Sequence, residues 1–143
     1  MGDLLYIIVP IVAWVVSQGA KYIYTAMREK SIKVFSNIYM SGNMPSAHSA
    51  TVFSLTTIIG LKEGVTTSIF AVALILSVIV MYDAMMVRRA VGEQGEYIKK
   101  IINNSSSKTT KQPFFAKGHK PIEVAVGAII GATVAIVVFI ATK

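Results

Sequence analysis

The sequence predicts an all-α membrane protein: a polytopic helical bundle of four spans that forms a single transmembrane domain over residues 1–143. Apolar residues make up 54% of the chain and charged residues only 15%, which is far from the balance of a water-soluble domain. The apolar residues are also gathered in long stretches. Strands in such stretches would leave backbone groups unpaired in lipid, so helices are expected.

The four predicted spans cover about residues 4–25, 46–61, 65–87 and 121–142. All except the second reach the roughly 20 residues that a helix needs to cross about 30 Å of hydrocarbon. The second is shorter and contains several Ser and Thr residues, so a re-entrant or interfacial helix is the alternative there. The first follows Asp3 rather than a basic run and has no small-residue cleavage site, so we expect it to remain as a span.

The segment between the third and fourth spans is predicted to hold a short interfacial helix and then a flexible linker. Residues 92–104 combine Tyr97 and three isoleucines with Lys99 and Lys100, a mixture typical of a helix lying among lipid head groups. Residues 103–116 begin with the polar run N-N-S-S-S-K-T-T-K, which favours a linker.

Positive charge predicts the orientation. The formal charge is +7, and 12 of the 14 Lys and Arg residues lie in residues 21–45 and 88–120, which four spans would place on one side of the membrane. The positive-inside rule puts that side in the cytoplasm and both termini outside. In so apolar a chain the basic excess suggests no nucleic-acid partner. The absence of cysteine excludes disulfides, thiolate metal sites and a cysteine nucleophile.

Polar residues gather at the same predicted membrane face at every span. They are Lys21 and Arg28 with Gln18 and Thr25, then Ser46 and His48, then Asp83, Arg88 and Arg89, and finally His119 and Glu123. Each group alone has a structural explanation, such as snorkelling or a stop-transfer anchor, but membrane insertion does not require all of them at one face. Cations, hydroxyls and helix-start amides together suit a phosphoryl group.

The two histidines are the candidates for catalysis of phosphoryl transfer. A neutral imidazole can attack phosphorus, and a protonated one can give its proton to the departing alkoxide. A metal site built from His48, Asp83, His119 and Glu123 is the competing interpretation, but the surrounding cations favour an anion. We therefore expect no metal and no cofactor. The pair Gly127 and Gly131, four residues apart among alanines, predicts close helix packing rather than binding.

The segment Ser41–Ser49, S-G-N-M-P-S-A-H-S, resembles the type 2 phosphatidic acid phosphatase superfamily, which is related to vanadium haloperoxidases, and within it a short divergent branch of membrane proteins. The superfamily pattern consists of K-x6-R-P, P-S-G-H and S-R-x5-H-x3-D. Lys21 and Arg28 have the first spacing, with Glu29 in place of proline. Pro45–His48 matches the second element, with alanine in place of glycine.

The third element is split in this chain. Its arginine corresponds to Arg88 or Arg89, and its H-x3-D to His119 and Glu123. The resemblance implies that His119 is the nucleophile, that Glu123 orients it, and that His48 is the acid and later the base. It also implies phosphate binding by a set of residues at the same face: Lys21, Ser46, Arg88 or Arg89, with Arg28. Asp83, which lies beside these arginines at the end of the third predicted span, is a further candidate for substrate binding.

These residues predict a metal-independent membrane phosphatase that hydrolyses a lipid phosphomonoester or diphosphate through a phosphohistidine intermediate. A non-catalytic protein that binds or transports phospholipid head groups is the alternative, and a small helical subunit of a larger complex is a third hypothesis. Typical superfamily members have six spans, which leaves room for a homodimer in which a second copy supplies pocket walls.

Overall fold

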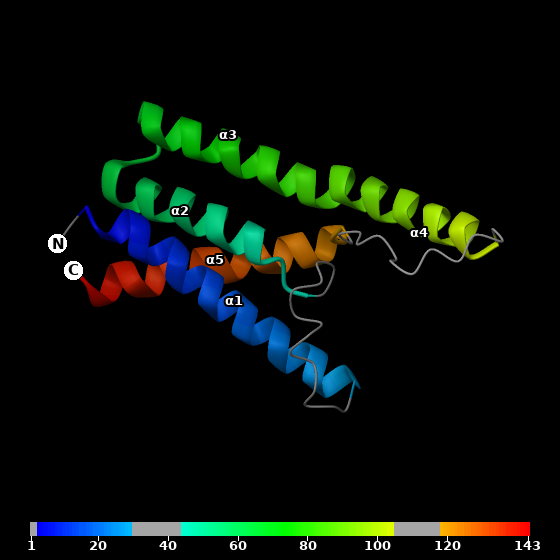
Figure 1. Ribbon diagram of the computed structural model, residues 1–143. Helices are drawn as coiled ribbons and strands as arrows, with labels where there is room; N and C mark the ends of the chain where they lie inside the picture. The colour runs from blue at the N-terminus through cyan, green and yellow to red at the C-terminus, as the bar shows by residue number, and fades with distance from the viewer. Residues whose placement is uncertain (1–2, 30–43, 105–117) are drawn as a thin grey trace.

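The computed structural model describes residues 3–29, 44–104 and 118–143, and it shows a bundle of helices (Figure 1). No strand occurs within these ranges, so the all-α prediction is confirmed there. The elements in chain order are α1 (Leu5–Glu29), α2 (Ala47–Glu63), α3 (Ser68–Tyr82), the short π-helix η2 (Asp83–Val87), α4 (Arg88–Asn104) and α5 (Pro121–Ala141).

Helix α2 is the centre of the bundle. It packs on α5, α1 and α3, and α1 also packs on α5. The start of α1, the end of α5 and the turn between α2 and α3 lie at one end of the bundle (Figure 1). The starts of α2 and α5 lie at the opposite end, beside η2, which we call the site end.

Among the described residues, three helices are long and apolar enough to cross a membrane: Leu5–Met27, Ser68–Asn104 and Pro121–Ala141. The protein is therefore an integral membrane protein with several spans. Helix α2, with 17 residues, is not among these three, so a fourth span is not confirmed. Its polar side chains are hydrogen-bonded within the bundle: Thr56 Oγ1 lies 2.7 Å from Ser77 Oγ, which donates to the Val52 carbonyl at 3.0 Å.

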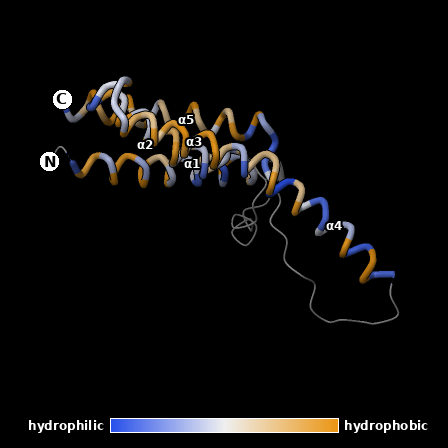
Figure 2. Tube along the Cα trace, turned by 90° about the horizontal axis from the view of Figure 1, so that it is seen from above, coloured by the Kyte–Doolittle hydropathy of each residue, from blue (hydrophilic) through white to orange (hydrophobic). Residues whose placement is uncertain are grey.

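The prediction of a separate interfacial helix is wrong in one respect, because α4 continues α3 through η2 without a break. The sequence around Arg88 contains no proline, so nothing there ends the helix. Beyond the bundle, α4 alternates polar and apolar residues, as expected of an amphipathic helix (Figure 2). It ends at Asn104, so the predicted linker 103–116 overlaps α4 in its first two residues and otherwise lies outside the described residues.

Small residues bring α5 and α2 into backbone contact. A Cβ at Gly127 would collide with the Ser46 carbonyl oxygen, and one at Gly131 would collide with the Ala50 carbonyl oxygen. Only residues without a side chain allow so close an approach. The predicted packing role of this glycine pair is confirmed, and the close contact brings the start of α5 to the start of α2.

Candidate functional site

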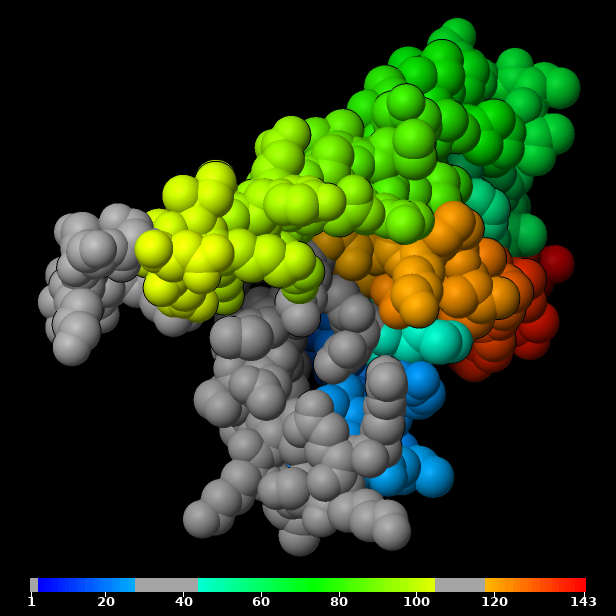
Figure 3. Space-filling model, turned by 90° about the vertical axis from the view of Figure 1, so that its right-hand side faces the viewer, coloured from blue at the N-terminus to red at the C-terminus, as the bar shows by residue number. Residues whose placement is uncertain are grey.

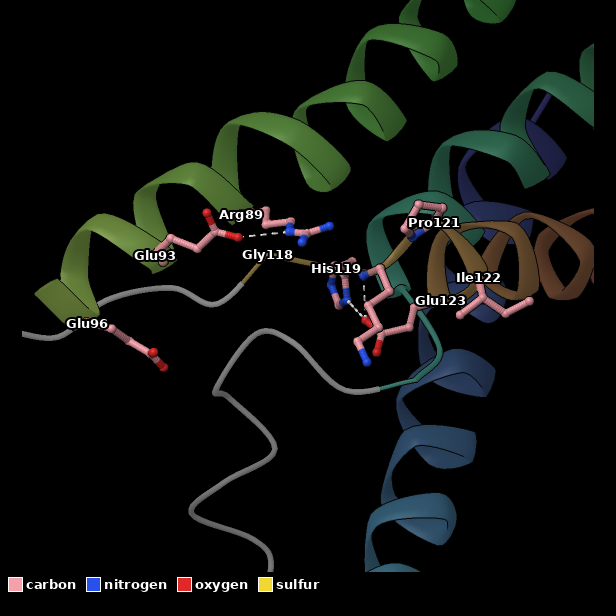
Figure 4. A pocket seen from close by; sticks show the side chains of 10 residues that line it. Arg89, Glu93, Glu96, Gly118, His119, Pro121, Ile122 and Glu123 are labelled. Carbon is pink, nitrogen blue, oxygen red and sulfur yellow. Dashed lines mark hydrogen bonds and ion pairs between the residues drawn. The ribbon is translucent and has the colours of Figure 1, made fainter.

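His119 and Glu123 form a buried pair at the start of α5 (Figure 4). Nδ1 of His119 lies 3.1 Å from Oε2 of Glu123, and the side chains are 3% and 11% exposed. The same oxygen accepts a hydrogen bond from the Lys120 backbone N–H at 3.1 Å, so the carboxylate also caps the helix. With Nδ1–H donating to a carboxylate, neutral His119 keeps its lone pair on Nε2.

Backbone contacts fix the position of His119. Its N–H donates to the carbonyl of Ala84 in η2 at 3.0 Å. The preceding residue, Gly118, lies so close to the Arg89 backbone that a Cβ would approach it to less than 3.0 Å. On the other side, the Ser46 N–H donates to the Glu123 carbonyl at 3.0 Å. The start of α5 is therefore held between the π-helix and the start of α2. Such π-helical segments occur often at functional sites.

The start of α2 supplies hydroxyls and the second histidine. Ser46 is the N-cap residue and is fully buried. Its Oγ accepts hydrogen bonds from the Ser49 hydroxyl at 2.9 Å and from the Ser49 N–H at 3.4 Å. His48 is exposed at this helix start, and its Nε2 lies 3.5 Å from Nη1 of Arg88.

The two adjacent arginines have different surroundings. Arg88 Nε donates to Asp83 Oδ2 at 2.7 Å, and the same guanidinium faces His48. Arg89 Nε instead donates to Glu93 Oε1 at 3.0 Å on the surface of α4, where both side chains are about 60% exposed: 59% and 62%. The structure therefore brings Arg88 rather than Arg89 to His48.

Lys21 of α1 completes the charged surroundings of His119. It is only 5% exposed, and α1 and α5 pack together. Burial is the main cause that lowers the pKa of His119 below its usual value, and the Lys21 and Arg88 charges lower it further. The Glu123 hydrogen bond opposes them without overcoming them. His119 is therefore neutral near pH 7, with the charges of Lys21 and Arg88 acting on it.

The two histidines lie at the same end of the bundle but line different cavities. His119 and Glu123 line an open cavity of about 630 Å³ with Arg89 and Glu93. His48 lines another, of about 570 Å³, with residues of α1, α3, η2 and α4. Figure 3 shows the starts of α5 (orange) and α2 (cyan) side by side between the α3–α4 helix and the end of α1. Arg88 lines the second cavity, and its charge acts on His119 of the first.

Most of the residues expected at the site are described in detail. Lys21, Ser46, His48, Asp83, Arg88, His119 and Glu123 meet at the site end. Arg89 lies at its edge, and Arg28 is in the last turn of α1, with a side chain outside the described part. Among the residues that the structure describes, no three His, Cys, Asp or Glu side chains converge as a metal site would require.

Sequence reasoning missed two features that position the site. One is the Ala84 carbonyl, which carries no side-chain signal at all. The other is the close approach of Gly118 to α4. The glycine directly before His119 was a signal that could have indicated the second feature, since glycine often marks a close backbone approach.

The fold and the site define a class: a helical membrane protein with a cationic, histidine-containing site where its helices begin. The chain belongs to the divergent PAP2 family, whose family model matches residues 4–134. It is 37% identical to the uncharacterized membrane protein YuiD of Bacillus subtilis (strain 168), over 68% of this chain and 70% of that protein. No solved structure matches the chain significantly. The predicted family resemblance is thereby confirmed.

Proposed function

We propose that this protein is a membrane phosphatase that hydrolyses a lipid phosphomonoester or diphosphate through a phosphohistidine on His119. The observation that carries the proposal is the buried His119–Glu123 pair, with Nδ1 and Oε2 3.1 Å apart, near the charges of Lys21 and Arg88. The carboxylate fixes the ring so that Nε2 is the free, nucleophilic nitrogen. Membership of the divergent PAP2 family supports a phosphatase-type activity.

In the first step, Nε2 of His119 attacks phosphorus and the bond from phosphorus to the lipid oxygen breaks. The departing oxygen takes a proton from His48 and leaves as an alcohol, or as a monophosphate when the substrate is a diphosphate. Lys21 and Arg88 balance the negative charge of the phosphoryl oxygens, which lets a nucleophile approach an anionic centre. Glu123 stabilises the positive charge that the His119 ring acquires.

In the second step, water attacks the phosphohistidine. His48, now neutral, accepts a proton from that water, the N–P bond breaks, and inorganic phosphate leaves. His119 returns to its neutral form and His48 to its protonated form, so the cycle closes without a metal. Positioned acid and base catalysis of this kind contributes about 10²–10⁴-fold.

The contact between Arg88 and His48 fits this role for His48. Its Nε2 and Arg88 Nη1 are 3.5 Å apart, so a phosphoryl oxygen bound beside them could accept from both. Two positively charged donors repel each other without an anion, and a bound phosphate removes that repulsion. Substrate binding therefore favours the protonated imidazole, which is the form that serves as the acid.

The test is phosphate release from vesicles that contain purified protein and a panel of lipid phosphates and diphosphates. We expect His119→Ala and His48→Ala to abolish release while circular dichroism shows the same helix content. Vanadate should inhibit, because it mimics the pentacoordinate transition state, and a chelator should not. Unchanged turnover in either variant would overturn its assigned role.

A second candidate function, non-catalytic binding of phospholipid head groups, is favoured by one observation: His48 and His119 line different cavities. The variant His119→Asn separates the two hypotheses. A binding protein would keep its affinity for phosphatidate vesicles and would never yield an acid-labile phosphohistidine. A phosphatase would show that intermediate in the unsubstituted protein and lose it in the variant.

We also propose that the site end faces the cytoplasm, because four of the described basic residues, Lys21, Arg88, Arg89 and Lys120, lie there. The chain contains no cysteine, so single cysteines report orientation directly. Asn104→Cys, at the end of α4, should be protected from an impermeant maleimide in intact cells, whereas Thr142→Cys should react. The reverse pattern would place the site outside.

A further inference from the structure

The cavity beside His48 has one polar end and apolar walls. Helices α1 and α3 both pack on α2, and they lie on either side of it (Figure 1), so α2 forms the floor between them. This cavity of about 570 Å³ we call the tail groove. Its apolar side chains are Trp14, Val52, Ile79 and Val80, and its polar ones are His48, Thr51, Asp83 and Arg88.

The polarity of the tail groove changes in the same direction along α2 and along the helix formed by α3, η2 and α4. On α2, His48 precedes Val52 by four residues, which is roughly 6 Å along a helix. On the opposite wall, Arg88 follows Ile79 by nine residues, or roughly 13 Å. Trp14 lies seven residues before Lys21 on α1, which is roughly 10 Å further from the site end. The groove therefore leads from charged groups into the apolar part of the bundle.

The tail groove is open on its apolar side. Trp14 is 46% exposed and Ile79 is 59% exposed. Both belong to helices that are long and apolar enough to cross a membrane, so their exposed surfaces meet hydrocarbon. Trp14 lies in the middle of its span, away from the head-group region where tryptophan usually concentrates.

We propose that the tail groove holds the first part of the hydrocarbon chain of a lipid phosphomonoester whose phosphate lies at Arg88 and His48. Charge complementarity selects this occupant: Arg88 binds Asp83 through Nε, and its Nη1, which lies beside His48, can bind a phosphate that carries about −1.5 to −2 charge. The volume of about 570 Å³ lies within the range of ligand sites. The inference rests on the proposed function for the identity of the head group, and it assigns Trp14 and Ile79 to recognition of the chain.

Trp14 is the single tryptophan of the protein, so its fluorescence reports on the groove. The protein is reconstituted in phosphatidylcholine vesicles with increasing mole fractions of phosphatidic acid that carries bromine atoms on the upper part of its acyl chains. Bromine quenches an indole that it contacts. The comparison lipid is phosphatidylcholine with the same brominated chains.

We expect brominated phosphatidic acid to quench Trp14 at a mole fraction about tenfold lower than brominated phosphatidylcholine, and unbrominated phosphatidic acid to reverse the effect. Arg88→Gln should remove most of that preference, because it removes the charge at the polar end. Arg89→Gln is the matched control, because it changes the same residue type at the next position in the chain. It should keep the preference for phosphatidic acid, because Arg89 is paired with Glu93 outside the groove.

Quenching that follows mole fraction alone, equal for the two head groups, would overturn the inference, since Trp14 would then contact only bulk lipid. A preference that Arg88→Gln leaves intact would overturn it as well. The readout needs no turnover, so His119→Ala should keep the head-group preference while it abolishes phosphate release. Selective quenching without phosphate release would reject the proposed phosphatase and keep the groove. Phosphate release with unselective quenching would reject the tail groove as a lipid site and keep the proposed phosphatase.

Discussion

Gly127 offers the sharpest test of how packing between helices builds the site. A Cβ at this position would lie 3.1 Å from Ser49 Cβ and much closer to the Ser46 carbonyl oxygen, which is held in place because it accepts the first hydrogen bond of α2, from the Ala50 N–H at 3.1 Å. Atoms in favourable contact are about 3.5 Å apart or more, so in Gly127→Ala the two helices must separate by about 1 Å.

That separation has two costs. Overpacking of this kind typically destabilises a protein by about 1–3 kcal/mol. The hydrogen bond from the Ser46 N–H to the Glu123 carbonyl, 3.0 Å long, would also stretch beyond hydrogen-bonding distance. Because this bond connects the two halves of the site, we expect phosphate release to fall by about 10²-fold, which is the effect of a displacement of roughly 1 Å.

Gly19→Ala is the matched control for Gly127→Ala. Gly19 lies in α1, and a Cβ there would have no atom within 4 Å. The same substitution should stabilise that helix by about 0.5–1 kcal/mol, since glycine is the more costly residue in a helix interior. Unfolding by SDS titration, followed by circular dichroism, and phosphate release measure both effects. If Gly127→Ala matched Gly19→Ala in stability and activity, the backbone contact inferred between α2 and α5 would be refuted.

Three further predictions concern the charged pair, its titration and the hydrogen bonds between helices. Glu123→Gln should keep helix α5 capped but reduce phosphate release by about 10²–10⁴-fold, because a neutral amide does not stabilise a charged imidazole. The control variant Glu63→Gln lies at the opposite end of the bundle and should leave the rate of phosphate release unchanged. His119 must be neutral to attack, and its pKa is lowered, so kcat/KM should stay high as the pH falls to 6.5 and decline only below that value; an acid limb above pH 6.5 would contradict the assignment. Ser77→Ala should lower the free energy of unfolding by about 0.6 kcal/mol, and by no more than roughly 1.7, because the serine bonds α3 to α2. Thr133→Val, whose hydroxyl bonds only within its own helix, should show a smaller loss in the same SDS titration.

The helices could be predicted from the sequence because lipid leaves the backbone few choices. Long apolar stretches must form helices there, and the lengths of α1 and α5 follow from the thickness of the membrane. The meeting of His48 and His119 at one end could be predicted too. Two helices that run in opposite directions, α2 and α3, lie between them in the chain, so both histidines lie at the same end of the bundle (Figure 1).

The choice between Arg88 and Arg89 could not be predicted in this way. Neighbouring residues point about 100° apart around a helix, so the rotation of α4 decides which one faces His48. The π-helix Asp83–Val87 changes that rotation, since its hydrogen bonds enclose one more residue than those of an α-helix. Its position is tied to the contact between Ala84 and His119, which lie 35 residues apart in the sequence. No local pattern contains that information.

The end of the bundle where chemistry is proposed is also where the helices need partners for their backbone groups. The first N–H groups of a helix have no carbonyl to bind within the helix, and leaving them unpaired near lipid is costly. Here the N–H of Ser46 binds a carbonyl of α5, and the N–H of His119 binds a carbonyl of η2. The first bond satisfies the start of α2, the second holds the segment directly before α5, and each places a side chain that the proposed reaction uses. Substitutions that disturb these bonds should therefore reduce stability and activity together, whereas His119→Ala, which keeps the backbone bond, should separate the two.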